Sequence, residues 1–192
     1  MRLHNDRYEE IKSIVVKTFE KYGISEIPID CFELARRMDI IIIPFSELTQ
    51  VQLNNIGFCE GEAIMISLND ITYIFYNDID NNISRQRFSI FHEIGHYVLG
   101  HKGESELSKS EADFFARYAI APIPLVWKLQ CLDVISIKNT FNTSFECASI
   151  IKKNYDNWIN YGGETLKLFE KKNLSNSELK AFCCFKGCHS IL

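Results

Sequence analysis

The chain has 192 residues, a formal net charge of −4 and 46% hydrophobic residues. This length fits one domain, or a domain with a small appendage, and the apolar content is enough for a sizeable core. The mild negative net charge does not indicate binding to nucleic acid through overall charge. The N-terminus lacks the apolar core of a signal peptide, and the longest nearly apolar run, 39–45, is too short to span a bilayer. We therefore expect a cytoplasmic protein with no membrane partner.

The seven cysteines do not have the pattern of a disulfide framework, because their number is odd and four of them lie far apart. A reducing compartment is their natural setting. The four isolated ones are expected to be small buried hydrophobes: Cys31, Cys59, Cys131 and Cys147. The C-terminal group has enough ligands for a second zinc ion, but its spacing favours a disordered or oxidation-prone tail: Cys183, Cys184, Cys188 and His189.

Apolar residues spaced three and four apart predict an N-terminal helix over residues 4–22, with Gly23 as its C-cap. A short helix follows through Met38, with Asp30 as its N-cap. The next segments are short and rich in β-branched and aromatic residues, which indicates a small sheet. Its strands are expected at 39–44, 63–67 and 71–76, with a turn candidate at 60–62.

A long helix is predicted over 84–99 and ends at Gly100. The next is predicted over 111–120, because Ser108 with Glu111 matches a capping box, and Ser110 is an alternative cap. Residues 125–180 are mostly helical by pattern, and 133–151 have a helix–turn–helix rhythm in which Ser144 caps the second helix. Basic residues come only at the end of that helix, so a structural role is favoured over DNA binding.

The segment that carries chemistry is His92-Glu93-Ile94-Gly95-His96, within the long helix. Two histidines four residues apart are offset by only about 40° and one turn, so both imidazoles can bind one ion. Glu93 lies roughly 100° around the helix, where it can reach a water molecule at the metal without ligating it. Apolar residues surround the motif on nearly every face, which predicts a buried helix in which unpartnered histidines would be costly. The alternative is a pair of histidines that are merely hydrogen-bonded.

A catalytic zinc site usually has three protein ligands and one open position. The acidic candidates downstream are Glu104, Glu106 and Glu111. Glu111 is favoured because it begins a helix that packs against the first one, whereas the other two lie in a loop. The alternative for Glu111 is a charge that complements the helix dipole. Mn²⁺ or Fe²⁺ could occupy the same ligand set as Zn²⁺.

These motifs resemble those of the ImmA/IrrE family of metallopeptidases. The resemblance spans roughly residues 25–155 and is carried by 87–96, by Glu111-Ala112-Asp113-Phe114-Phe115-Ala116 and by Ala121-Pro122. It implies an α+β, zincin-like core with a small antiparallel or mixed sheet packed on the HExxH helix, followed by a helical, helix–turn–helix-like part. It implies His92, His96 and Glu111 as zinc ligands and Glu93 as the catalytic base. Asp113 stands where the family commonly has Asn, and its carboxylate is a candidate partner for a ligand histidine.

The activity that the resemblance implies is hydrolysis of a peptide bond by a regulatory endopeptidase. The implied substrate is a helix–turn–helix transcriptional repressor, often encoded nearby in a mobile element or stress circuit. Tyr97, His101 and Tyr118 are candidates for stabilising the oxyanion or supporting the metal ligands, although each is more readily explained by a structural role. Two alternatives are a metal-binding transcriptional regulator without proteolytic activity and a metal-binding domain of a toxin–antitoxin system.

The expected division of the chain is a zinc peptidase domain at 1–122, a helical extension at 123–180 and a cysteine-rich tail at 181–192. The strand at 71–76 directly precedes the helix of the metal motif. It is either an edge strand that receives the substrate as an added strand, or an ordinary core strand.

Overall fold

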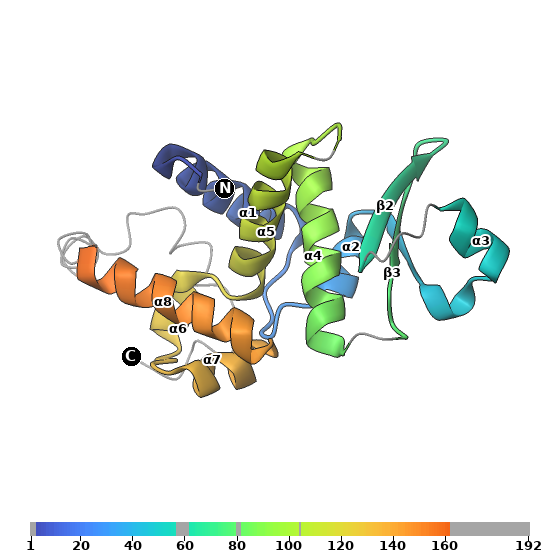
Figure 1. Cartoon of the computed structure of the whole chain (residues 1–192). Helices are drawn as coiled ribbons and strands as arrows, with labels where there is room; N and C mark the ends of the chain where they lie inside the picture. The colour runs from blue at the N-terminus through green and yellow to red at the C-terminus, as the bar shows by residue number, and fades with distance from the viewer. Residues whose placement is uncertain (1–2, 57–61, 80–81, 104, 162–192) are drawn as a thin grey trace. The chain divides into compact units, whose positions relative to one another are not determined.

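The computed structural model describes residues 3–56, 62–79, 82–103 and 105–161 (Figure 1). The chain divides into two compact units. The first is built mainly from Asp30–Ala116, and the second from His4–Ile29 and the described residues from Arg117 onwards. Within these ranges, no helix has the length and apolar character needed to cross a bilayer. The division predicted at 122/123 stays a prediction, and Cys59 and the predicted tail lie outside the described residues.

A three-stranded mixed sheet forms one side of the first unit. Its strands are β1 (Ile40–Pro44), β2 (Ala63–Leu68) and β3 (Ile71–Tyr76), in the order β1-β3-β2. β3 pairs in parallel with β1 and antiparallel with β2, so the small mixed sheet that we predicted is confirmed. Because β3 is the central strand, the core-strand interpretation of 71–76 is confirmed and the edge-strand interpretation is wrong. The backbone edge nearest the metal-motif helix belongs to β2 instead.

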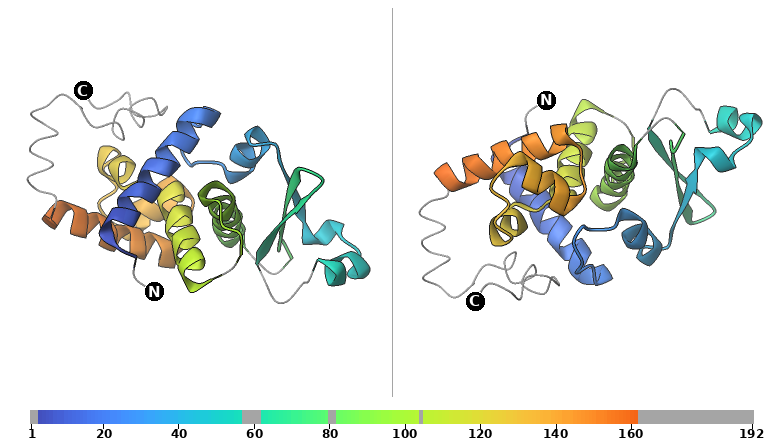
Figure 2. Two further views of the ribbon diagram at one scale, coloured as in Figure 1. Left: turned by 90° about the horizontal axis from the view of Figure 1, so that it is seen from above. Right: turned by 90° about the horizontal axis from the view of Figure 1, so that it is seen from below.

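Two helices cover the inner face of this sheet. α4 (Ile83–Leu99) packs on β2 and β3, and α2 (Cys31–Arg37) packs on β1 and α4. The inward residues of β3 alternate as period-two geometry requires, with Thr72 and Ile74 buried. Figure 2 shows α4 between the sheet and the first part of α5 (Glu106–Ile120), so α4 is the middle layer of the first unit.

Two short elements that follow β1 were not predicted from the sequence. These are a 3₁₀ turn at Phe45–Glu47 and helix α3 at Gln50–Asn55. Thr49 caps α3 through a reciprocal capping box with Gln52. The Thr-x-x-Gln pattern at 49–52 is therefore the local signal that would have found it.

α4 begins and ends at specific polar and glycine caps. The Asn82 side chain accepts a hydrogen bond from the Arg85 N–H, and Gly100 ends the helix in the left-handed conformation at φ 70°. The prediction that α4 is buried on nearly every face is wrong, because Tyr97 is 43% exposed. Phe88, Val98 and Leu99 are only partly buried. Burial is confined to one face and the middle of the helix, at Arg87, Ser89, Ile90, Phe91, Ile94, Gly95 and His96.

α5 begins at Glu106, not at Glu111 as predicted. The backbone N–H of Ser108 donates to the Ser105 hydroxyl, and the N–H of Ser105 donates to the Ser108 hydroxyl. This reciprocal pair has the form of a capping box with serine in place of glutamate. Ser108 therefore lies inside the first turn instead of preceding the helix. Glu111 consequently lies in the second turn, where the helix-dipole explanation for its charge is weak.

The second unit is helical. It contains α1 (Asn5–Tyr22), α6 (Ile123–Lys128), α7 (Val134–Phe141) and α8 (Phe145–Tyr161), with α6 and α7 packed on α8. Gly23 ends α1 in the left-handed conformation, and the Ser144 hydroxyl accepts from the Cys147 N–H at the start of α8, as predicted. The functional identity of the α7–α8 pair as a helix–turn–helix stays a prediction.

The close approach of α4 and α5 at Gly95 gives a prediction about stability. A Cβ at Gly95 would lie 3.1–3.2 Å from side-chain atoms of Phe115, whereas one at Gly103 would meet nothing within 4 Å. We expect Gly95→Val to lower the free energy of unfolding by about 1–3 kcal/mol through overpacking. The matched Gly103→Val variant should stay within about 0.5 kcal/mol of the wild type. Urea denaturation measures both, and equal stabilities would contradict this packing.

Candidate metal centre

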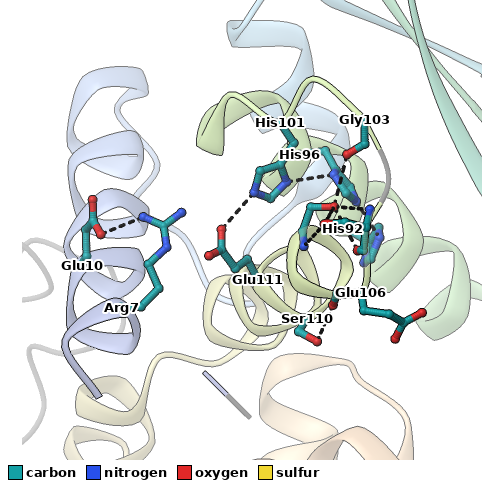
Figure 3. A network of polar contacts seen from close by, with 11 residues as sticks. Arg7, Glu10, His92, His96, His101, Gly103, Glu106, Ser110 and Glu111 are labelled. Atoms are coloured by element: carbon teal, nitrogen blue, oxygen red, sulfur yellow. Dashed lines mark hydrogen bonds and ion pairs between the residues drawn. The ribbon is translucent and has the colours of Figure 1, made fainter. Parts of the chain in front are cut away.

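His92 and His96 lie one turn apart on α4 and turn their rings towards each other (Figure 3). Their Nε2 atoms are 3.1 Å apart, and the ring centroids are 4.8 Å apart. Two imidazole nitrogens that each lie about 2.0–2.1 Å from one tetrahedral ion are separated by about 3.3 Å. The two rings are therefore already spaced to share an ion.

Asp113, on α5, fixes the proton of His92. The Nδ1 atom of His92 lies 2.9 Å from Oδ1 of Asp113. An ionised carboxylate only accepts hydrogen bonds, so Nδ1 must carry the proton of the neutral ring. Nε2 of His92 is then the nitrogen with the lone pair, and it faces His96.

His101 and Glu111 fix the proton of His96 in the same way. Nε2 of His101 lies 3.0 Å from Oε2 of Glu111, and Nδ1 of His101 lies 2.9 Å from Nδ1 of His96. The Glu111 carboxylate accepts from Nε2–H of His101, so Nδ1 of His101 accepts from Nδ1–H of His96. Nε2 of His96 is left with its lone pair, facing His92.

Two lone pairs therefore face each other across 3.1 Å, in a partly buried position. Neutral rings in these tautomers supply no proton between the two nitrogens, and two acceptors at this distance repel each other. A cation between them satisfies both, and the nearby carboxylates supply compensating charge. The donor set consequently fits a metal ion such as zinc, which imidazole binds well.

Glu111 is the candidate third ligand that hydrogen bonds connect to this arrangement, through His101. It is buried, whereas Glu106 is exposed and Glu104 lies outside the described residues. Among the described residues, no three metal-binding side chains surround a common point. In this structure Oε2 of Glu111 is directed to His101. A carboxylate has two oxygens, so one can accept from His101 while the other serves as a ligand.

The remaining site candidates take different positions. Glu93 is half-buried on α4 beside the histidine pair, and Tyr97 is exposed on the same helix. Tyr118 is buried and belongs to the second unit. Cys31 is a buried hydrophobe, as predicted, and burial raises the pKa of its thiol to about 12.

Glu62 is a polar residue near the site that was not predicted from the sequence. Its carboxylate pairs with Arg85 and accepts a hydrogen bond of 2.9 Å from the Ser89 hydroxyl, both on α4. These bonds hold the start of β2 against the helix that carries the histidines. No local pattern signals them, because the partners lie 23 and 27 residues from Glu62 in the chain.

The fold and the site define an α+β protein whose HExxH helix packs on a small mixed sheet. Residues 58–122 match the family model of the IrrE N-terminal-like domain, Peptidase_M78. This match confirms the ImmA/IrrE resemblance and identifies the segment, which contains β2, β3, α4 and α5, as belonging to a peptidase family. No curated protein matches the chain.

The Glu62 contacts predict unequal roles for its two partners. Glu62→Ala would leave the hydroxyl of Ser89, a residue only 4% exposed, without this acceptor. We expect it to lower the free energy of unfolding by about 1–3 kcal/mol. Arg85→Ala removes a half-exposed ion pair and should cost about 0–1 kcal/mol. Urea denaturation compares them, and equal losses would show that the Ser89 bond contributes nothing.

Proposed function

We propose that the chain is a zinc-dependent endopeptidase in which His92, His96 and Glu111 hold the metal and Glu93 is the general base. The single observation that carries this proposal is the pair of Nε2 atoms that face each other at 3.1 Å, each on a ring whose Nδ1 has its own hydrogen-bond partner. The match to a peptidase family over 58–122 supports hydrolysis of a peptide bond as the reaction.

The carboxylate of Glu93 is suited to proton transfer. When bound, zinc would polarise the scissile carbonyl and lower the pKa of a water molecule in its open position towards about 7. Glu93 follows His92 directly and so lies roughly 100° around the helix from it. It is therefore beside the helix face that carries His92 and His96, and not on that face. From there it takes the proton of the attacking water and later delivers it to the leaving amine.

An extended protein segment is the substrate that this geometry favours. β2 is an edge strand of the sheet and packs on α4, the helix of the histidine pair. The backbone of an extended peptide can pair with such an edge. Glu62 holds the start of β2 on α4, so a peptide paired there would run along a fixed support. The repressor as the particular substrate rests on the family resemblance.

The regulator alternative receives no comparable support. DNA binding through α8 would need exposed basic side chains. The prediction that basic residues come only at the end of this helix is wrong, because α8 continues to Tyr161 and the two lysines lie in its middle. Lys152, one of them, has its ammonium 2.6 Å from both carboxylate oxygens of Asp156 on the same helix. Its charge is therefore already compensated within α8, which favours a structural role for this pair of helices.

The base assignment is tested by Glu93→Gln, which keeps the shape of the side chain and removes its proton acceptor. We expect cleavage to fall by about 10²–10⁴-fold, while one equivalent of zinc is retained. The matched control is Glu106→Gln, an exposed carboxylate on α5, which should change neither quantity. Cleavage of a helix–turn–helix repressor, the proposed substrate class, and metal content by mass spectrometry are the measurements. Full activity in Glu93→Gln would overturn the assignment.

The role of Asp113 is tested separately by zinc affinity. Asp113→Ala removes the acceptor for Nδ1–H of His92, and we expect the affinity to fall about 10–100-fold. Asp113→Asn keeps an oxygen that can accept the same hydrogen bond, so its loss should be smaller. Competition with a chromogenic chelator measures both variants. Equal affinities in the wild type and Asp113→Ala would remove Asp113 from the site.

A further inference from the structure

We propose that His101 is a positioning residue that couples the two candidate ligands His96 and Glu111, and that it does not donate to the substrate. This inference rests on the proposed metal site. It also assigns one of the two roles that the sequence left open for His101. Two features of the structure carry it: the chain reversal after α4 and the use of both ring nitrogens.

The end of α4 places His101 over His96. Gly100 has φ 70°, the His101 N–H donates to the His96 carbonyl at 3.1 Å, and the Gly100 N–H donates to the Tyr97 carbonyl at 3.2 Å. These two bonds define a Schellman motif. In that motif the side chains at the positions of His96 and His101 usually meet in a hydrophobic contact. Here the contact is between two imidazoles, with ring centroids 4.8 Å apart and planes at 73°.

Both nitrogens of the His101 ring are used within the protein. Nδ1 accepts from His96 and Nε2 donates to Glu111, at 2.9 and 3.0 Å (Figure 3). The His101 and Glu111 side chains are only 11% and 8% exposed, so water competes little for these bonds. A neutral imidazole has one donor and one acceptor, so no N–H of His101 remains for an oxyanion.

His101 thereby links ligands from two different helices. Its Nδ1 holds the His96 ring on α4, and its Nε2–H holds the Glu111 carboxylate on α5. Replacing groups that orient metal ligands in this way typically lowers metal affinity about 10–100-fold. Replacing His101 should consequently loosen one imidazole and one carboxylate at once, although His101 itself binds no ion.

The test is zinc affinity of the full chain with His101→Phe, which keeps the ring volume and removes both hydrogen bonds. We expect the zinc dissociation constant to rise about 10–100-fold. The visible spectrum of the cobalt-substituted protein should change as well, because it reports the coordination geometry. Lys102→Gln, at the exposed neighbouring position, is the control and should match the wild type in both measurements.

A double-mutant cycle separates a coupling role from general damage. If His101 acts through Glu111, then His101→Phe in a Glu111→Gln background should lose clearly less affinity than in the wild type. Equal losses in the two backgrounds would overturn the coupling. The side chain of His101→Gln can make one of the two hydrogen bonds but not both at once. Its zinc affinity should therefore fall between those of the wild type and His101→Phe. It replaces His101→Phe in the cycle if that variant does not fold.

The outcomes also separate this inference from the proposed function. A wild type that binds no zinc, or that binds it equally well as His92→Ala, overturns the metal site and this inference together. Zinc binding that depends on His92 but is unchanged within about twofold in His101→Phe overturns this inference alone. Cleavage lost in His101→Phe at unchanged zinc affinity and cobalt spectrum would assign the ring to the substrate instead.

Discussion

The arrangement of protons on three histidines is the constraint on which the site depends. Carboxylates cannot donate, so Asp113 and Glu111 determine the tautomers of His92, His101 and, through His101, His96. The result is two lone pairs that face each other in a partly buried position. In water such a pair would rotate apart or take up a proton. Here the packing of α4 between the sheet and α5 prevents that rotation and holds the two rings at the spacing that the proposed metal site requires.

The separation of α4 and α5 sets which carboxylate reaches which ring. Gly95 allows the two helices to approach closely at Phe115, since a Cβ there would lie only 3.1–3.2 Å from side-chain atoms of Phe115. Glu111 and Asp113 lie two residues apart on α5 and so point about 200° apart around its axis. The two carboxylates therefore cannot both contact the same histidine directly. Asp113 reaches His92 itself, whereas Glu111 contacts His101 in the loop, and His101 extends its influence to His96.

Local signals predicted the parts of the fold that local chemistry decides. Asp30 and Gly100 were correctly predicted as the ends of their helices, and the HExxH spacing was enough to predict that both imidazoles point to one side of the helix. The start of α5 was misplaced because Ser105 with Ser108 and Ser108 with Glu111 offer equivalent capping patterns, and only the reciprocal hydroxyl bonds decide between them. The central position of β3 and the Glu62 contacts depend on pairing between distant segments, which no local window contains.

The residue at position 113 shows how one substitution changes the protonation of a ligand. An asparagine there, as is common in the resembled family, can present its oxygen or its NH₂ group to Nδ1 of His92. With the NH₂ group presented, Nδ1 accepts and the proton of the neutral ring moves to Nε2, where it would block the proposed metal site. Asp113 has no such alternative while it is ionised, so it keeps the proton of the neutral His92 ring on Nδ1. The carboxylate therefore selects the tautomer of the proposed ligand His92 as well as supplying charge.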